Sequence, residues 1–179
     1  MSLLEFATWL QSTPFSVAIQ SASWVVPTLQ SLHILMIGVV FVSILMIAMR
    51  VLGRVRMDES VSQVWARFSP FLWTGLIVMA LTGVLLVISE PVREFMTLSF
   101  RLKMLLLAIG VTSAILFARS VRGAAKAGGQ SRFPLRTRIA AVATVLLWLA
   151  VIFLGRAIAY DDVVWGAWSP AVLAGADST

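Results

Sequence analysis

The chain has 179 residues, of which 60% are hydrophobic and 12% are charged. An ordinary soluble domain has about 25% charged residues, so water cannot be the main solvent of this chain. Cysteine is absent and His33 is the single histidine, which excludes disulfide frameworks, thiolate metal sites and cysteine nucleophiles. The net charge of +6 comes from basic residues beside apolar runs. That distribution argues against nucleic-acid binding and is typical of a membrane topology signal.

Residues 1–22 predict an N-terminal interfacial segment. Apolar residues recur there at helical spacing between polar ones: Leu3, Phe6, Ala7 and Leu10. This pattern is typical of a short amphipathic helix that lies in the membrane interface. No basic region precedes the segment and Pro14 interrupts it, so we expect it to belong to the mature protein rather than to a cleaved signal peptide.

Four apolar runs follow, and a hydrocarbon core requires about 20 helical residues to cross it. The runs are Val25–Met49, Phe71–Ser89, Met104–Ala118 and Ile139–Tyr160. The third is the shortest, but the basic side chains at its two ends can extend their charges to the interfaces. The sequence therefore predicts an all-α integral membrane bundle of four transmembrane helices over residues 23–162, followed by a C-terminal tail over 163–179.

The connections between the runs carry weaker signals. Residues 58–68 predict a short helix with Asp58 or Ser60 as its N-cap, and Pro70 is expected at the start of the second span. Residues 123–134 are rich in glycine and end near a proline, which predicts a flexible loop.

The basic residues of these connections predict the orientation of the bundle. Four lie between the first two spans and six between the last two, so ten of the 14 lysines and arginines fall on one side. The positive-inside rule makes that side cytoplasmic. We therefore expect a protein of the bacterial inner membrane with both termini on the periplasmic side.

His33 is the first residue to consider for chemistry. It follows Trp24, near the expected outer interface, by a helical rise of roughly 13 Å. Gln30 and Met36 lie on the same helical stripe. An ionisable side chain at this depth is costly and therefore suggests function. The open alternatives are a neutral histidine that hydrogen-bonds across a helix interface, a haem or metal ligand, and part of a proton or quinone site.

Arg156 is the second residue to consider, because it lies inside the fourth span at a depth similar to that of His33. A guanidinium there must extend to the interface, pair with a carboxylate such as Asp161 or Glu90, or hold an anionic ligand group. If the first and last helices pack together, Arg156 and His33 are expected to line one outward-facing pocket. Lys103, at the outer start of the third span, can join them.

The single histidine limits the possible cofactors. Ligation of haem by two histidines is impossible within one chain, so a haem b at His33 would be five-coordinate or would take Met104, Met79 or a partner's ligand. Copper is the other metal to consider, because the thioether of Met36 and the imidazole together favour Cu(I). The acidic residues lie outside the spans or at their ends, which argues against an autonomous proton-coupled pump.

Several short motifs occur between residues 24 and 160: Trp24–Pro27, Leu32-His33, Arg50–Gly53, Phe100–Lys103 and Gly155–Tyr160. Together they resemble a family of uncharacterised bacterial membrane proteins defined by a domain of unknown function. Members of that family usually have a glutamate where Gln30 stands, a departure that argues against a carboxylate-assisted metal site. The shape of the family is reminiscent of the membrane protein D of bacterial copper resistance and of small cytochrome b-like subunits, and it implies a copper or haem function by analogy.

These observations lead to three functional hypotheses. The first is a redox-type membrane subunit with a haem b or quinone site, whose cofactor-binding residues are His33, Arg156, Lys103, Gln30 and Met104. The second is a copper-handling membrane protein that uses His33 and Met36. The third is a non-catalytic scaffold or anchor. We do not expect an enzyme on its own. The expected partners are the lipid bilayer and either other membrane or periplasmic subunits or further copies of the chain, but not nucleic acid.

Overall fold

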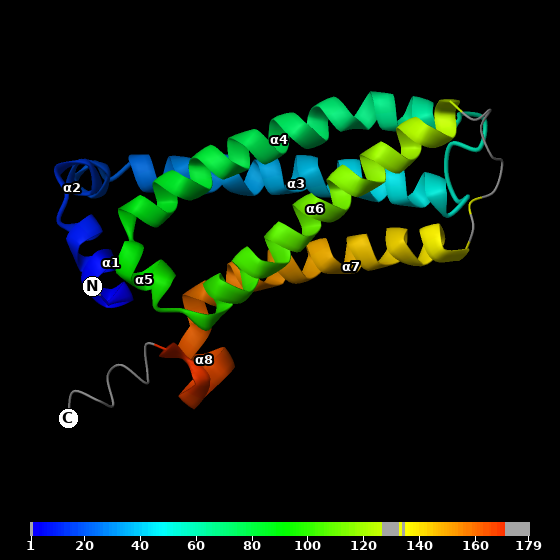
Figure 1. The fold of residues 1–179 in the computed structure, drawn as a ribbon. Coiled ribbons are helices and arrows are strands. Elements are labelled where there is room, and N and C mark those ends of the chain that lie inside the picture. Colours follow the sequence, from blue (N-terminus) through cyan, green and yellow to red (C-terminus); the bar gives the residue numbers. More distant parts are fainter. Residues whose placement is uncertain (1, 127–132, 134, 171–179) are drawn as a thin grey trace.

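The computed structural model describes residues 2–126, 133 and 135–170, and this part of the chain is all helical (Figure 1). Four of its helices are long: α3 (Val25–Val51), α4 (Val61–Ser89), α6 (Leu98–Lys126) and α7 (Leu135–Ala157). Each contains a stretch that is long and apolar enough to cross a membrane. The predicted bundle of four transmembrane helices is therefore confirmed, and the chain is a multi-pass membrane protein.

The four long helices form a bundle with a simple pattern of neighbours. Helix α3 packs mainly against α4 and α7, and α6 packs against α7 and α4, so that α3 and α6 face each other diagonally across the interior. Figure 1 shows α3 and α4 running side by side. The main apolar core lies in the half of the bundle nearest the α3–α4 connection, and its members include Val40, Ile44, Leu72, Trp65 and Trp148.

Short helices gather at the opposite end of the bundle (Figure 1): α1 (Leu3–Gln11), α2 (Pro14–Ser21), α5 (Pro91–Phe95) and α8 (Asp161–Trp165). The predicted N-terminal helix is present, but it is followed by a second one. Thr13 caps α2 and Pro14 occupies its first turn, a position where the missing N–H of proline has no cost. Two 3₁₀ turns, Ile158–Tyr160 and Gly166–Trp168, flank α8.

Helix α4 is longer than the sequence predicted. Ser60 is its N-cap and forms a capping box with Gln63, so the short helix expected over 58–68 and the second span are one continuous helix. The prediction that Pro70 begins the span was wrong, because Pro70 lies inside α4. A proline removes one backbone hydrogen bond of the helix. A membrane helix tolerates this loss when neighbouring groups satisfy the freed carbonyl.

Helix α6 is also longer than predicted. It begins at Leu98 and continues to Lys126, so residues 123–126 are helical although the sequence suggested a loop there. The remainder of the predicted loop, residues 127–132 and 134, lies outside the described residues. The same is true of residues 171–179 of the predicted tail.

Two glycines allow the long helices to approach closely. A Cβ added at Gly75 on α4 would lie 2.7 Å from Cγ2 of Val40 on α3. A Cβ added at Gly110 on α6 would lie 2.9 Å from Cδ2 of Leu147 on α7. Both distances are too short for a real side chain, so the absence of a Cβ sets the separation of each helix pair.

Candidate functional site

His33 lies in the half of the bundle away from the main core, where α3 faces α4. Its Nδ1 is 2.8 Å from Oγ1 of the buried Thr82. The Thr82 hydroxyl is also 2.8 Å from the carbonyl oxygen of Val78, and it donates its single hydrogen there. With that hydrogen on Val78, Oγ1 of Thr82 accepts from Nδ1–H of His33, and from this geometry we infer a neutral imidazole with its proton on Nδ1.

This tautomer leaves Nε2 of His33 without a proton. Such a nitrogen can accept a hydrogen bond or ligate a metal, and a bond from the opposite ring N–H to a fixed acceptor is the usual way in which proteins orient it. The ring lies over Gly83 on α4, where an added Cβ would be 3.4 Å from Cε1, which is van der Waals contact. The imidazole is half-buried and rests against α4.

Lys103 on α6 brings a positive charge to the same half of the bundle. Its side chain lies against Gly155 on α7, where an added Cβ would be 3.6 Å from Nζ. The ammonium group is close enough to interact electrostatically with both His33 and Glu94. Because α3 and α6 are diagonal neighbours, the interaction between Lys103 and His33 runs across the interior of the bundle.

Glu94 lies on α5, at the end of the bundle and outside the long helices. Burial raises the pKa of its carboxyl group above the ordinary value of 4.5. The charges of Lys103 and Arg93 oppose this shift, and the charge of Glu90 adds to it. Glu94 therefore holds its proton more tightly than an exposed glutamate does.

The raised pKa of Glu94 predicts that stability falls as the pH rises. The folded protein binds this proton more tightly than the unfolded chain, so the contribution of Glu94 is fully present below about pH 4.5 and is lost as the pH passes through the higher folded pKa. Glu94→Gln should remove this part of the slope when unfolding by sodium dodecyl sulfate is followed from acid to neutral pH. Glu5→Gln is the control, because Glu5 is exposed and glutamine also completes its capping box. Equal slopes in all three proteins would contradict the prediction.

A comparison with known families places the chain in a wider group. A family model described as a family of unknown function (DUF6644) matches residues 9–161. The chain belongs to this family. The matched segment contains His33, Thr82, Glu94 and Lys103. No curated protein and no solved structure matches the chain, so the resemblance to copper-resistance membrane protein D and to cytochrome b-like subunits has no support.

Arg156 does not join His33 in this member of the family. Its side chain is exposed, with Nη2 3.4 Å from the Tyr160 hydroxyl and the guanidinium 5.4 Å from the centre of the Tyr160 ring. Of the three alternatives for its guanidinium, the ion pair with Asp161 or Glu90 is not formed, because both carboxylates have other partners. The exposed side chain agrees with the alternative of extension away from the bundle. The structure brings Lys103, rather than Arg156, into electrostatic contact with His33.

The other candidate residues, Gln30, Met104 and Met36, differ in how far they are buried. Gln30 is exposed on α3, and Met104 is 47% exposed on α6. Met36 is half-buried, and its backbone carbonyl lies 3.7 Å from the Cβ position of Gly75. Among the described residues, no group of three or more histidine, aspartate or glutamate side chains can hold a metal ion.

Asp161 forms a network that sequence reasoning missed. Its side chain is only 4% exposed and accepts hydrogen bonds from the backbone N–H groups of Leu98 at 3.1 Å and Ser99 at 2.8 Å. The Ser169 hydroxyl donates to it at 2.6 Å, and Nε1 of Trp165 donates to Oγ of Ser99 at 2.9 Å. A carboxylate that follows α7 therefore caps the N-terminus of α6. The large separation in sequence left no local pattern by which this cap could be recognised.

Proposed function

We propose that the chain is a redox-type membrane subunit that binds a quinol or quinone at His33 and Lys103. The observation that carries this proposal is the 2.8 Å contact between Nδ1 of His33 and Oγ1 of Thr82. With the proton on Nδ1, Nε2 is an acceptor inside an apolar bundle. A quinol hydroxyl donates to such a nitrogen, and an ammonium group donates to a quinone carbonyl. Quinones are apolar rings that carry oxygen atoms, so one acceptor and one cationic donor in a hydrocarbon environment fit their chemistry.

The charge of Lys103 favours a quinone over a metal. A copper or iron ion at Nε2 of His33 would place a second positive charge within electrostatic range of the ammonium group, and like charges repel strongly where the dielectric constant is low. A quinone carbonyl is instead stabilised by a nearby cation. Haem b, whose propionates are anionic, and copper bound by His33 and Met36 are the alternative occupants.

The loop charges suggest where this site acts. On the orientation that they predict, the short helices, Glu94 and the His33 site lie towards the periplasmic side of the inner membrane. A redox reaction of a bound quinol then requires a partner subunit that takes its electrons. The proposal therefore includes a protein partner on that side of the membrane.

Chemical analysis of the purified protein tests the proposal. The full chain is purified in mild detergent, its bound quinones are extracted and quantified by chromatography, and the visible spectrum and metal content of the same sample are recorded. We expect bound quinone, with retention lowered about tenfold by His33→Ala or Lys103→Met, the effect of losing one hydrogen bond. Ser31→Ala is the matched control, because Ser31 is exposed on α3 and its hydroxyl bonds within its own helix.

The alternatives give different results in the same experiment. A Soret band that is lost in His33→Ala would identify haem b as the occupant, and copper that is lost in His33→Ala would identify a copper site. Retention of quinone that is equal in the unmodified chain and in His33→Ala would contradict any role of the imidazole in binding. A protein without quinone, haem or copper would favour the scaffold or anchor hypothesis.

A further inference from the structure

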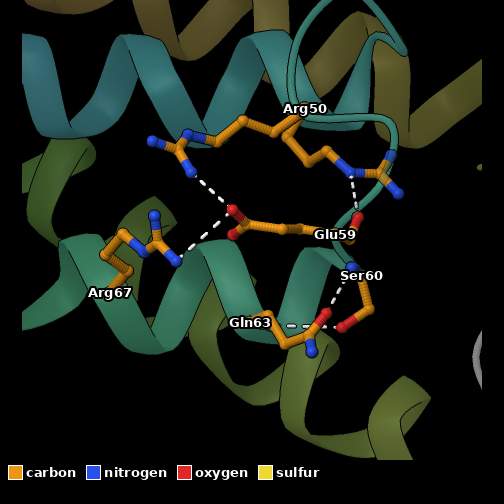
Figure 2. A network of polar contacts seen from close by, with 6 residues as sticks. Arg50, Glu59, Ser60, Gln63 and Arg67 are labelled. Atoms are coloured by element: carbon orange, nitrogen blue, oxygen red, sulfur yellow. Dashed lines mark hydrogen bonds and ion pairs between the residues drawn. The ribbon is translucent and has the colours of Figure 1, made fainter.

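A second polar network lies at the end of the bundle opposite to His33, in the connection between α3 and α4 (Figure 2). Glu59 is at its centre. Its Oε1 accepts from Nη1 of Arg56 and lies 3.3 Å from Nη2 of Arg67, and its backbone carbonyl accepts from Nε of Arg50 at 2.6 Å. Three guanidinium groups therefore surround one glutamate, and Arg54 adds a further positive charge to the same connection.

This network carries an excess of positive charge. Residues 50–67 contain four arginines but only two acidic residues, Asp58 and Glu59. Arg56 and Arg67 share one carboxylate oxygen, so neither makes the two parallel bonds that a guanidinium prefers to form with an anion. The side chain of Arg67 is 53% exposed. It therefore has N–H donors available to a ligand outside the bundle.

The cluster is held in place rather than carried on a free loop. Arg50 is only 7% exposed, and Arg56 has a backbone φ of 50°, which residues other than glycine rarely adopt. The Arg56 guanidinium also lies 5.9 Å from the ring centre of Phe68 on α4. The capping box of Ser60 starts α4 beside these groups, and the positive end of the helix dipole adds to their field. The connection is therefore organised to receive an anion.

We propose that Arg50, Arg54, Arg56 and Arg67 form a binding site for the phosphate of an anionic phospholipid headgroup. The cluster lies where two membrane-spanning helices end, which is the depth of the headgroups. Guanidinium groups bind phosphate oxygens through paired N–H donors, and arginine clusters beside spanning helices attract anionic lipids. Glu59 orients Arg56 and Arg67, whose exposed N–H donors bind the lipid phosphate. The buried Arg50 holds the backbone of Glu59 and contributes its charge.

Native mass spectrometry of the detergent-purified full chain tests the proposal. The protein is incubated with phosphatidylglycerol and phosphatidylcholine at equal concentrations, and we expect preferential retention of phosphatidylglycerol. Arg67→Gln should lower the ratio of the two adducts about fivefold, the effect of one basic residue at an anionic surface. Arg93→Gln removes the same charge from an exposed arginine that pairs with Glu90 at the other end of the bundle. This control should leave the ratio unchanged.

Two further measurements separate the proposal from its competitors. Glu59→Gln removes the internal anion and should raise the lipid ratio in the folded variant, whereas an ion-pair network with a purely structural role predicts no rise. Inorganic phosphate at the lipid concentration should not displace phosphatidylglycerol, and its displacement would identify a site for soluble phosphate instead. Equal losses in Arg67→Gln and Arg93→Gln, or equal retention of the two lipids by the unmodified chain, would overturn the proposal.

Discussion

Replacement of Asp161 by alanine should lower the free energy of unfolding by about 3 kcal/mol, the combined effect of a lost helix cap and of buried donors left without an acceptor. The carboxylate accepts from Leu98, Ser99 and Ser169, and the alanine variant offers none of them a replacement. Because two of these donors belong to the first turn of α6, the loss should also shorten that helix. Unfolding by sodium dodecyl sulfate, followed by far-ultraviolet circular dichroism, measures both effects.

Asp162→Ala is the matched control for Asp161→Ala. The two aspartates are adjacent and carry the same charge, but Asp162 is exposed whereas Asp161 is buried. We expect the free energy of unfolding to change by less than about 0.5 kcal/mol in Asp162→Ala. If both variants lost the same stability, the effect would come from the charge near the helix ends and not from the hydrogen bonds of Asp161.

Gly75→Val should also have a large effect. We expect it to lower the free energy of unfolding by about 3 kcal/mol, because the added side chain overpacks the contact between α3 and α4. The Cβ alone would lie 2.7 Å from Cγ2 of Val40. Val40 is only 1% exposed, and its branched side chain has no alternative position to adopt. The two helices must therefore move apart, and the variant should unfold at a lower temperature than the unmodified chain.

Gly38→Ala on α3 provides the control for Gly75→Val. No atom lies within 4 Å of the Cβ position of Gly38, so the added methyl group meets no obstacle. Alanine is also a better helix former than glycine, by about 1 kcal/mol in water. We therefore expect Gly38→Ala to unfold at the same temperature as the unmodified chain or at a higher one. A loss similar to that of Gly75→Val would show that close helix contact is not the cause.

The four spans could be predicted from the sequence because the bilayer imposes a length and a composition on each helix. Ser60 was also recognisable as an N-cap, since its capping partner lies close in sequence. Pro70 was misplaced for the opposite reason: whether a proline ends a membrane helix depends on the groups packed around it, which a single sequence does not reveal. The cap of α6 was missed because Asp161, which supplies it, follows the last span.

The sequence identified His33 and Arg156 as candidate site residues, but it did not indicate where their side chains point. Counting residues along a helix locates His33 and Arg156 at a similar distance from one interface. Their rotation about the helix axis depends on packing, and this turned Arg156 outward to Tyr160 while His33 faces Thr82. Threonine is common in membrane helices, so nothing in the sequence marked Thr82 as the partner. Lys103 was named as a neighbour from its place at the start of a span.

The cap that Asp161 provides for the N-terminus of α6 affects the order in which the bundle can assemble. Helices α3 and α4 are joined by a short connection and can pair as soon as both have left the ribosome. The first turn of α6 must wait, because its acceptor at Asp161 is synthesised 63 residues after Leu98. Until then the N–H groups of this turn require other acceptors, such as water or lipid headgroups. The hydrogen bonds that Asp161 accepts from the first turn of α6 can therefore form only after α7 has been synthesised.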